Sequence, residues 1–328
     1  MPTDADRLKA ILAASSALGI GLRPRRYDGD VADLIAEGRT DFAPAVAITI
    51  YFDALRERFA EGVVACWEEF VQRFDGQLTW YADEELGKWR TASADRLRRP
   101  TRRLGSSGPM PFYAWTSVSG ERFESASAVT FTATVRESAG GHLSFIRATF
   151  PTALTTEAAV EEFVIVARRW CERVPTLHGY GGLTVNQSPH EPQVNSGMLL
   201  QIAERFHGFE IDDCGGTVLV ARDFIKSTNW LTFLGRPFID RLGGVVELRS
   251  GLSPAIDLLP LKSGGAIVWA GRLPVRGDIH KDDDLESYRE VARRLRPVCL
   301  DAHPPLGPAE VGSFGSEKTR LWLGRLDT

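Results

Sequence analysis

The stretch Lys226-Ser-Thr-Asn-Trp-Leu-Thr-Phe-Leu-Gly235 decides the predicted fold of the second half of the chain. Its large apolar residues, together with those that follow, recur at the three-to-four-residue spacing of a helix. Pro237 is placed to kink or restart that helix, and the Gly243-Gly244 pair supplies a left-handed stop. The apolar stripe consists of Trp230, Leu231, Leu234, Phe238 and Leu242.

Strands and helices alternate upstream of this stretch. Residues 46–52 are rich in β-branched and aromatic residues and predict a strand, and residues 55–74 carry apolar residues at i+4 spacing and predict a helix. A strand at residues 78–81 completes a β-α-β unit. A helix that begins at Thr155 or Thr156, followed by a strand at residues 178–185, gives the same order again.

Three further strands are predicted between these units, at residues 111–118, 128–136 and 142–150. In residues 128–136 apolar side chains alternate with threonines and an arginine, so one face is expected to be buried and the other wet. This alternation is typical of antiparallel sheets.

The second half continues with a helix at residues 196–206 and, after the glycine pair, a strand at residues 245–249. Residues 258–261 and 266–270 flank Ser263-Gly264-Gly265 and predict a hairpin. Asp284 is expected to cap a last helix that Pro297 ends, and the tail after it carries one apolar patch at residues 321–323.

These elements predict an α+β fold with mixed, largely antiparallel sheets, β-α-β units and packed helices. We expect an N-terminal arm at residues 1–43, one domain at residues 44–300 and a C-terminal tail at residues 301–328 that wraps the surface. The repeated β-α-β order allows two similar halves, about 44–150 and 151–300, although the two copies share a pattern and not residues.

Composition favours a soluble protein and disfavours nucleic-acid binding. The 328 residues contain 39 Lys and Arg against 43 Asp and Glu, a net charge of −4, which provides no basic field for phosphates. Four cysteines lack a C-x-x-C pair and indicate a reducing compartment, the cytoplasm. Residues 11–20 resemble a signal peptide only weakly, because acidic residues precede them and arginines follow, and no other window reaches membrane-spanning length.

Glycine-rich motifs of the second half resemble the signature of a bacterial immunity family associated with type VI secretion, whose members neutralise antibacterial effectors, notably nucleases of the VRR-Nuc type. The resemblance covers about residues 45–300. Its matching residues are of structural types, and Arg236-Pro237 departs from the more continuous helix expected in relatives. The matching positions are His178, Gly179, Gly181, Gly182, Asn229, Trp230, Leu231, Thr232, Leu234, Gly235, Gly243, Gly244, Gly271, Pro274, Gly277 and Asp278.

The resemblance implies a cytoplasmic protein that binds a cognate toxin and occludes its active site, with no catalytic residue, cofactor or metal. A nuclease must carry a positive surface for DNA, so acidic side chains of an inhibitor can replace phosphates. We predict that the toxin-binding surface includes Glu84, Glu85, Asp282, Asp283 and Asp284, although each also fits a solvated surface charge.

Two other functions stay open on the sequence. A stand-alone hydrolase would use the His178 loop and Asp278 and should show a deep pocket with converging polar groups. A structural protein would self-associate through a large apolar patch.

Other candidate sites are weaker. Residues 312–319 have the length of a phosphate loop, but Glu317 replaces the glycine before the lysine, no apolar strand precedes it, and no following helix is predicted. Metal sites built from His280 with residues 282–284, or from His178 with residues 212–213, match no known ligand spacing.

The basic segment at residues 88–103 predicts a mobile loop or a polar helix followed by a turn. A solvated surface element, a partner-binding loop and a nucleic-acid contact all stay open for it. Trp89 is its only aromatic residue, so the stacking platform of a single-strand binder is missing.

Overall fold

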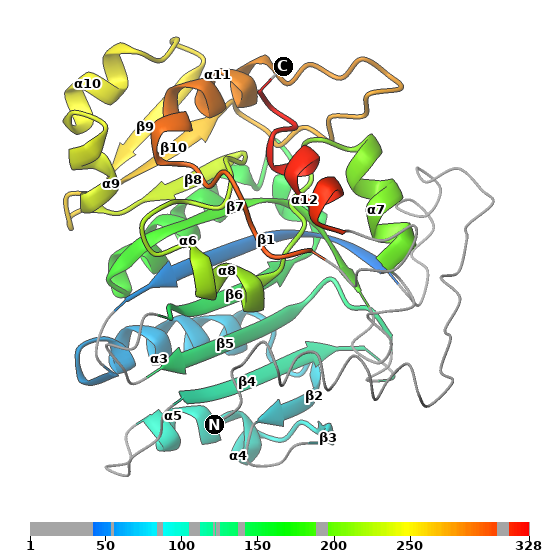
Figure 1. Ribbon diagram of the computed structural model, residues 1–328. Coiled ribbons are helices and arrows are strands. Elements are labelled where there is room, and N and C mark those ends of the chain that lie inside the picture. The colour runs from blue at the N-terminus through cyan, green and yellow to red at the C-terminus, as the bar shows by residue number, and fades with distance from the viewer. Residues whose placement is uncertain are drawn as a thin grey trace, which may run out of the picture.

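The computed structural model describes residues 42–53, 56–83, 88–104, 112–120, 122, 125–136, 142–187, 196–306 and 315–327. Within these residues ten strands form one sheet in the order β3-β2-β4-β5-β6-β1-β7-β8-β10-β9, and all neighbouring strands run antiparallel (Figure 1). The predicted α+β class is therefore confirmed. The strands are β1 (Phe42–Phe52), β2 (Leu78–Asp83), β3 (Arg90–Thr91), β4 (Phe112–Ser119), β5 (Thr130–Arg136), β6 (Ser144–Phe150), β7 (Thr176–Gln187), β8 (Leu231–Leu234), β9 (Ile256–Pro260) and β10 (Ala266–Ala270).

The helices lie on the two faces and at the ends of this sheet. In chain order they are α3 (Arg56–Arg73), α4 (Ala94–Leu97), α5 (Arg99–Leu104), the 3-10 turn η1 (Thr152–Thr155), α6 (Val160–Arg173), α7 (Ser196–Arg205), α8 (Cys214–Val220), α9 (Arg236–Arg241), α10 (Gly244–Ser250), α11 (Glu286–Leu295), the 3-10 turn η2 (Arg296–Val298) and α12 (Ser316–Leu323). None of the helices in the described ranges combines the length and the apolar character that crossing a bilayer demands.

The long strand β1 organises the sheet because it pairs antiparallel with β6 on one side and with β7 on the other. Its two neighbours therefore run parallel to each other, and α6 forms the crossover between them. Alternate side chains of β1 point to opposite faces of the sheet. Ile48 and Ile50 belong to the main core, whereas Tyr51 belongs to a separate cluster with Tyr180.

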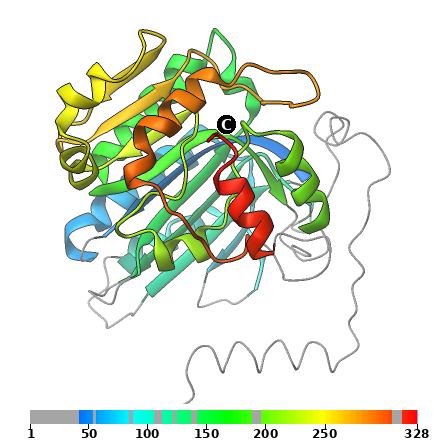
Figure 2. The ribbon, with the colours of Figure 1, turned by 45° about the horizontal axis from the view of Figure 1, so that its top comes forward.

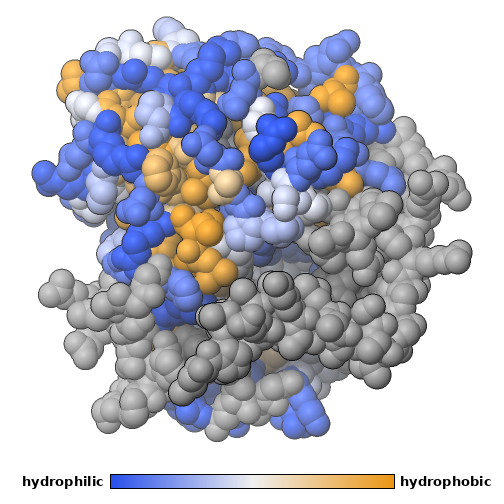
Figure 3. All heavy atoms as spheres, viewed as in Figure 1, coloured by the Kyte–Doolittle hydropathy of each residue, from blue (hydrophilic) through white to orange (hydrophobic). Residues whose placement is uncertain are grey.

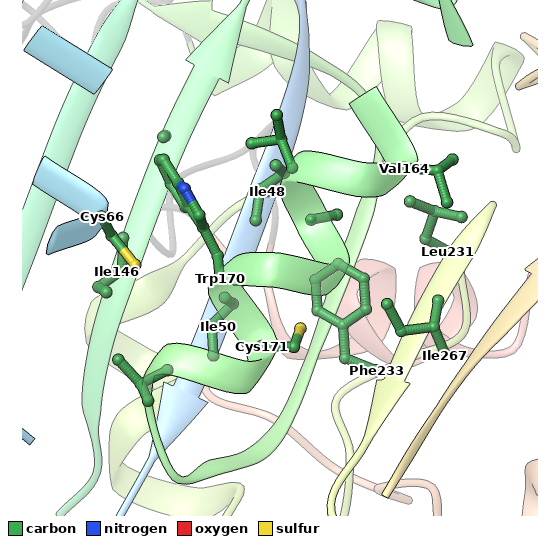
Figure 4. Packing of buried hydrophobic residues seen from close by; sticks show 14 of the residues in the cluster. Ile48, Ile50, Cys66, Ile146, Val164, Trp170, Cys171, Leu231, Phe233 and Ile267 are labelled. Carbon is green, nitrogen blue, oxygen red and sulfur yellow. The ribbon is translucent and has the colours of Figure 1, made fainter. Parts of the chain in front are cut away.

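The main core lies between the sheet and the helices α3 and α6. Figure 4 shows Trp170 of α6 beside Ile48 and Ile50 of β1, and Val164 near Leu231 of β8. The Trp170 ring lies 6.1 Å from the ring of Phe150 and is completely buried. Burial of such large side chains from helices and strands of both halves makes this layer the chief source of hydrophobic stabilisation.

The opposite face of the sheet carries α8, which packs through Val218 on a cluster with Tyr51, Phe145 and Tyr180. A backbone hydrogen bond from Leu143 N to Val218 O, 3.0 Å long, attaches this short helix to the start of β6. Figure 2 shows α7 and α12 side by side, and Leu200 and Trp322 are in the apolar cluster between them.

The predicted helix through Trp230 is wrong. Residues Leu231–Leu234 form β8, which pairs with β7 and β10, and the helix α9 begins only after Gly235. All four residues of β8 are buried, and a short strand buried on both faces has the same continuous apolar run as a buried helix.

The strand predicted at residues 245–249 is also wrong, because these residues lie in α10. Only Leu248 of α10 is buried, while Val246 is 84% exposed, so the valines that favoured a strand do not face a core. The left-handed glycine pair is confirmed, with φ of 86° at Gly243 and 93° at Gly244.

The other helices and strands named below were predicted correctly, with small differences at their ends. The hairpin β9–β10 and the helices α3, α6, α7 and α11 are all present. The basic segment forms β3, α4 and α5, with the Trp67 indole of α3 donating a 2.8 Å hydrogen bond to Leu97 O. In the tail, α12 begins at Ser316, so the helix judged to be missing after the phosphate-loop-like stretch exists, and residues 312–314 lie outside the described residues.

The predicted domain boundaries stay a prediction, as does the division into two similar halves. Residues 1–41 of the predicted arm lie outside the described residues.

Glycines of β7 allow β8 to approach closely. A Cβ atom on Gly179 would lie 2.2 Å from Thr49 O and 3.0 Å from the Phe233 ring. We expect Gly179→Ala to lower the free energy of unfolding by about 2 kcal/mol, because a central strand cannot move aside. Urea denaturation measures this change.

The matched control is Gly215→Ala in α8, where the new Cβ would meet only Asp213 Oδ1 at 3.6 Å. Its stability should stay the same or rise by up to about 1 kcal/mol through helix propensity. Equal stability of the two variants would contradict the close packing of β7 on its two neighbours, β1 and β8.

Candidate functional site

Side chains of the Lys226–Gly235 stretch surround a buried carboxylate, that of Glu210. The Lys226 Nζ atom lies 2.9 Å from Glu210 Oε1, and both side chains are fully buried. Glu210 Oε2 accepts hydrogen bonds from Ser227 Oγ at 3.1 Å and from Asn229 Nδ2 at 3.0 Å. Arg325 brings a second cation to 3.6 Å. Lys226, Ser227 and Asn229 are therefore donors arranged around one carboxylate.

The neighbouring motif residues shape the backbone around this set. Asn229 Oδ1 accepts a 2.7 Å hydrogen bond from Trp230 N, and a Cβ on Gly182 would lie 2.0 Å from the same Oδ1 atom. The Trp230 indole donates to Gly271 O at 2.9 Å and stacks on Phe163. A side chain at position 182 would thus displace Asn229 from the position that holds Glu210.

A second ion pair lies two residues along the chain, at Asp212. Arg147 Nη2 is 2.7 Å from Asp212 Oδ2, and Tyr180 and Thr184 donate to the same carboxylate at 2.5 and 3.0 Å. Burial alone raises the pKa of the Asp212 carboxyl, but the charges of Arg147 and Lys226 outweigh it and hold the pKa below its usual value. Asp212 is therefore a fixed, fully bonded anion.

A cavity of about 300 Å³ opens beside this pair on the face of the sheet that carries α8. Burial raises the pKa of the Cys214 thiol in its wall to about 12, so the thiol stays protonated at neutral pH. The Asn186 side chain is also engaged, since its Oδ1 atom accepts from Arg147 at 2.7 Å. The lining residues are Trp89, Thr116, Val118, Ser125, Ser127, Thr130, Thr132, Phe145, Arg147, Val185, Asn186, Gln187, Asp212 and Cys214.

His178 and Asp278, the two residues of the hydrolase hypothesis, have separate partners. His178 stacks on Tyr51, and its Nε2 atom lies 2.7 Å from Ala221 O. Burial lowers the His178 pKa to about 4, so the ring is neutral and donates this hydrogen bond. Asp278 instead forms two hydrogen bonds with Arg205, of 2.8 and 2.9 Å, which hold its pKa below the usual value.

The predicted toxin-binding aspartates follow Asp278 in the loop before α11. Asp283 accepts a hydrogen bond from Asp278 N at 3.0 Å. The prediction that Asp284 caps α11 is wrong, because Leu285 holds the N-cap position, and Asp284, one residue before it, accepts a 2.8 Å hydrogen bond from Glu286 N. Asp282 is exposed and has a positive φ of 51°. Glu84 and Glu85 lie outside the described residues.

Several other residues that carry the family resemblance are required by the local backbone geometry. Gly271 and Gly277 have φ of 85° and 66°, and a Cβ on Gly235 would lie 2.4 Å from Thr176 O. Thr232 Oγ1 accepts from Asn229 N at 3.1 Å. In the part of the chain that the structure describes, no group of three or more His, Cys, Asp and Glu side chains is arranged to hold a metal ion.

Comparison with known proteins gives these residues their context. The family model described as type VI immunity for VRR-NUC, TsiV, matches residues 62–326. The chain belongs to this family. TsiV proteins are type VI immunity proteins against VRR-Nuc effectors, so the predicted resemblance is confirmed.

A solved structure adds the fold. The chain is similar to the Pseudomonas aeruginosa T6SS protein PA0821, with a TM-score of 0.78 and 22% identity over 99% of this chain and 92% of that chain. At this identity the likeness shows that the two share a fold. No match was found among curated proteins.

The charged partners of the Lys226–Gly235 stretch were not predicted from the sequence. Glu210 precedes this stretch and Arg325 follows it near residue 328, and Arg147 lies in a strand without any local pattern that indicates an ion pair. One signal was present, because Glu210 stands directly between Phe209 and Ile211, but His207 and the acidic pair Asp212-Asp213 flank these residues and are typical of a solvated segment. A carboxylate between two large apolar residues is a mark of a buried anion that needs a cation.

The Glu210–Lys226 pair leads to a double-mutant prediction. We expect Glu210→Gln to lower the free energy of unfolding by about 3 to 5 kcal/mol, because it leaves the fully buried Lys226 ammonium without its anion. Lys226→Met in the same chain should recover part of this loss. Urea denaturation of both single variants and the double variant gives the coupling energy, and strictly additive losses would contradict the pair.

His178 predicts a pH dependence of stability. Its pKa is lowered in the folded state, so the unfolded chain binds the proton more readily between pH 6.5 and about 4. The stability from this group is complete above pH 6.5 and decreases as the pH falls through that window, by about 3 kcal/mol in total. Chemical denaturation across the window measures it.

The comparison for this measurement is His178→Gln, which cannot titrate. His207 and His303 also have lowered pKa values and contribute a slope of the same sign to both proteins. The difference between the two slopes isolates His178, and identical slopes would show that the ring is not buried and neutral.

Proposed function

We propose that this chain binds a VRR-Nuc-type effector nuclease in the cytoplasm and blocks it by steric occlusion, without turnover. The observation that carries the proposal is the match of the type VI immunity family to residues 62–326. The four free cysteines at positions 66, 171, 214 and 299 support a reducing compartment.

The state of the polar groups supports a binding role. A hydrolase needs a nucleophile beside a base with a suitable pKa. The Cys214 thiol has its pKa raised to about 12, His178 has its pKa lowered to about 4, and Asp212 is bonded to Arg147. The most reactive residue types on this face are therefore held in unreactive forms.

A stand-alone hydrolase is the second candidate, because the cavity beside Asp212 has the concave shape and polar lining of a ligand site. It requires a substrate and a reacting pair of residues. Since the charged residues in the cavity wall neutralise each other, the geometry favours inhibition.

The test is titration of the cognate VRR-Nuc nuclease with the purified chain. We expect its nuclease activity to fall linearly to zero at a fixed molar ratio, and the two proteins to co-elute on gel filtration. Multiple-turnover recovery, in which a small fraction of the chain inactivates all of the nuclease, would instead indicate an enzyme. No inhibition at any ratio would reject the proposal.

A further inference from the structure

A groove of about 210 Å³ separates α7 from α12. Leu200 and Ala203 of α7 and Trp322 of α12 supply its apolar lining, and the Glu204–Lys318 ion pair joins the two helices. Leu321 also lines the groove and is 52% exposed. A single exposed leucine on a surface is ordinary, but an exposed leucine next to an apolar groove is unusual. The groove is therefore suited to bind an apolar side chain of a partner.

The loop before α11 contacts the C-terminal end of α7, beside the groove. His207, which lines the groove, donates its backbone N–H to Gly277 O at 3.0 Å, and Ile279 N donates to Arg205 O at 3.0 Å. Figure 2 shows this loop next to α7 and α12. Groove and loop therefore form one continuous surface, which we call the α7–α12 surface (residues 200–207, 277–284 and 317–325).

The loop is held in a fixed conformation although it projects from the molecule. The two Arg205–Asp278 hydrogen bonds attach its base to α7, and Asp283 accepts from Asp278 N within it. Its apolar residue Ile279 is nevertheless 46% exposed. A projecting loop that is already ordered loses little entropy when a partner binds.

Charge on this surface favours a basic partner. The Glu204–Lys318 pair is neutral in sum, and the remaining exposed carboxylates outnumber the exposed cations. A nuclease must present positive charge to hold the phosphates of its substrate, so such a surface attracts it. The exposed carboxylates are Asp282, Asp284 and Glu317, and the exposed cations are Lys281 and Arg320.

The competing apolar patch lies on α8 and just after it, where Figure 3 shows apolar residues left of the centre. Leu219, Val220 and Phe224 are exposed there. The Arg241 guanidinium covers the Phe224 ring at 4.9 Å and is exposed, so a solvent-facing cation lies in the patch itself. Arg325 also lies over an aromatic ring in the groove wall, 3.8 Å from Trp322, but it is buried and lies 3.6 Å from Glu210. A basic partner is therefore better matched by the α7–α12 surface.

We propose that the α7–α12 surface is the docking site for a basic segment of the effector nuclease, which places apolar side chains against Ile279 and into the groove at Leu321. This inference rests on the proposed function and adds the face that makes contact. The carboxylates speed the encounter, and the two apolar residues hold the complex.

The experiment measures the Kd for the cognate VRR-Nuc nuclease by biolayer interferometry. The double variant Ile279→Arg with Leu321→Arg places positive charge at both anchors, and we expect its Kd to rise at least about 100-fold, since each central anchor accounts for about tenfold or more. Val246→Arg is the matched control, because it makes the same change at an apolar residue that is 84% exposed on the distant helix α10. Its Kd should stay within about twofold of the wild type.

The outcomes separate this inference from the proposed function. If the wild-type chain does not bind the nuclease, the proposed function fails. If the wild type binds and the double variant binds equally well, or if Val246→Arg weakens binding as much, the docking site is wrong. A wild-type homodimer that the double variant dissociates, with nuclease binding unchanged, would assign the surface to self-association and also overturn the proposal.

A second pair of variants keeps the test decisive if the double variant does not fold. Asp282→Asn and Glu317→Gln remove exposed charges, and an asparagine tolerates the positive φ at position 282. We expect them together to slow association at low salt and to reduce its dependence on salt, with little change in dissociation. Unchanged association rates would argue against a basic partner at this surface.

Discussion

The buried Glu210 carboxylate is the constraint on which the arrangement of the second half depends. Lys226 and Asn229 of one segment contact it, as does Arg325, which follows the end of α12. A carboxylate without water is costly unless cations and donors surround it, so these segments must converge wherever it is buried. Such a buried cluster adds little net stability, and its main effect is to fix how these segments pack against one another.

Elements with long, regular patterns were predictable from the sequence. The i+4 apolar spacing of α3, the alternation in β5 and the Gly-rich turn between β9 and β10 each reflect one local rule that the fold obeys. The wrong element predictions lie where tertiary packing, and not the local pattern, decides between helix and strand. Trp230 to Leu234 has an apolar run that suits a helix or a doubly buried strand, and only the glycines of β7, which make room for Leu231 and Phe233, select the strand.

The polar clusters were predictable only in part. The signature residues Asn229 and Gly182 were recognised as structural, and the structure gives their reason, since Gly182 leaves room for the Asn229 amide. The Asn229 partner Glu210 was not identified because the hydrogen bond joins two different segments of the chain and follows no local spacing rule. Surface residues such as Asp282 carry still less information in sequence, because a binding charge and a solvated charge have the same local pattern.

The position of Arg325 has a consequence for timing. Arg325 follows Glu210 by 115 residues, so during synthesis a chain that has not yet exposed residue 325 lacks this second cation, although Lys226, Ser227 and Asn229 are already present. The tertiary structure around Glu210 can therefore be completed only after residue 325 has emerged, and domains fold as units once their sequence is available.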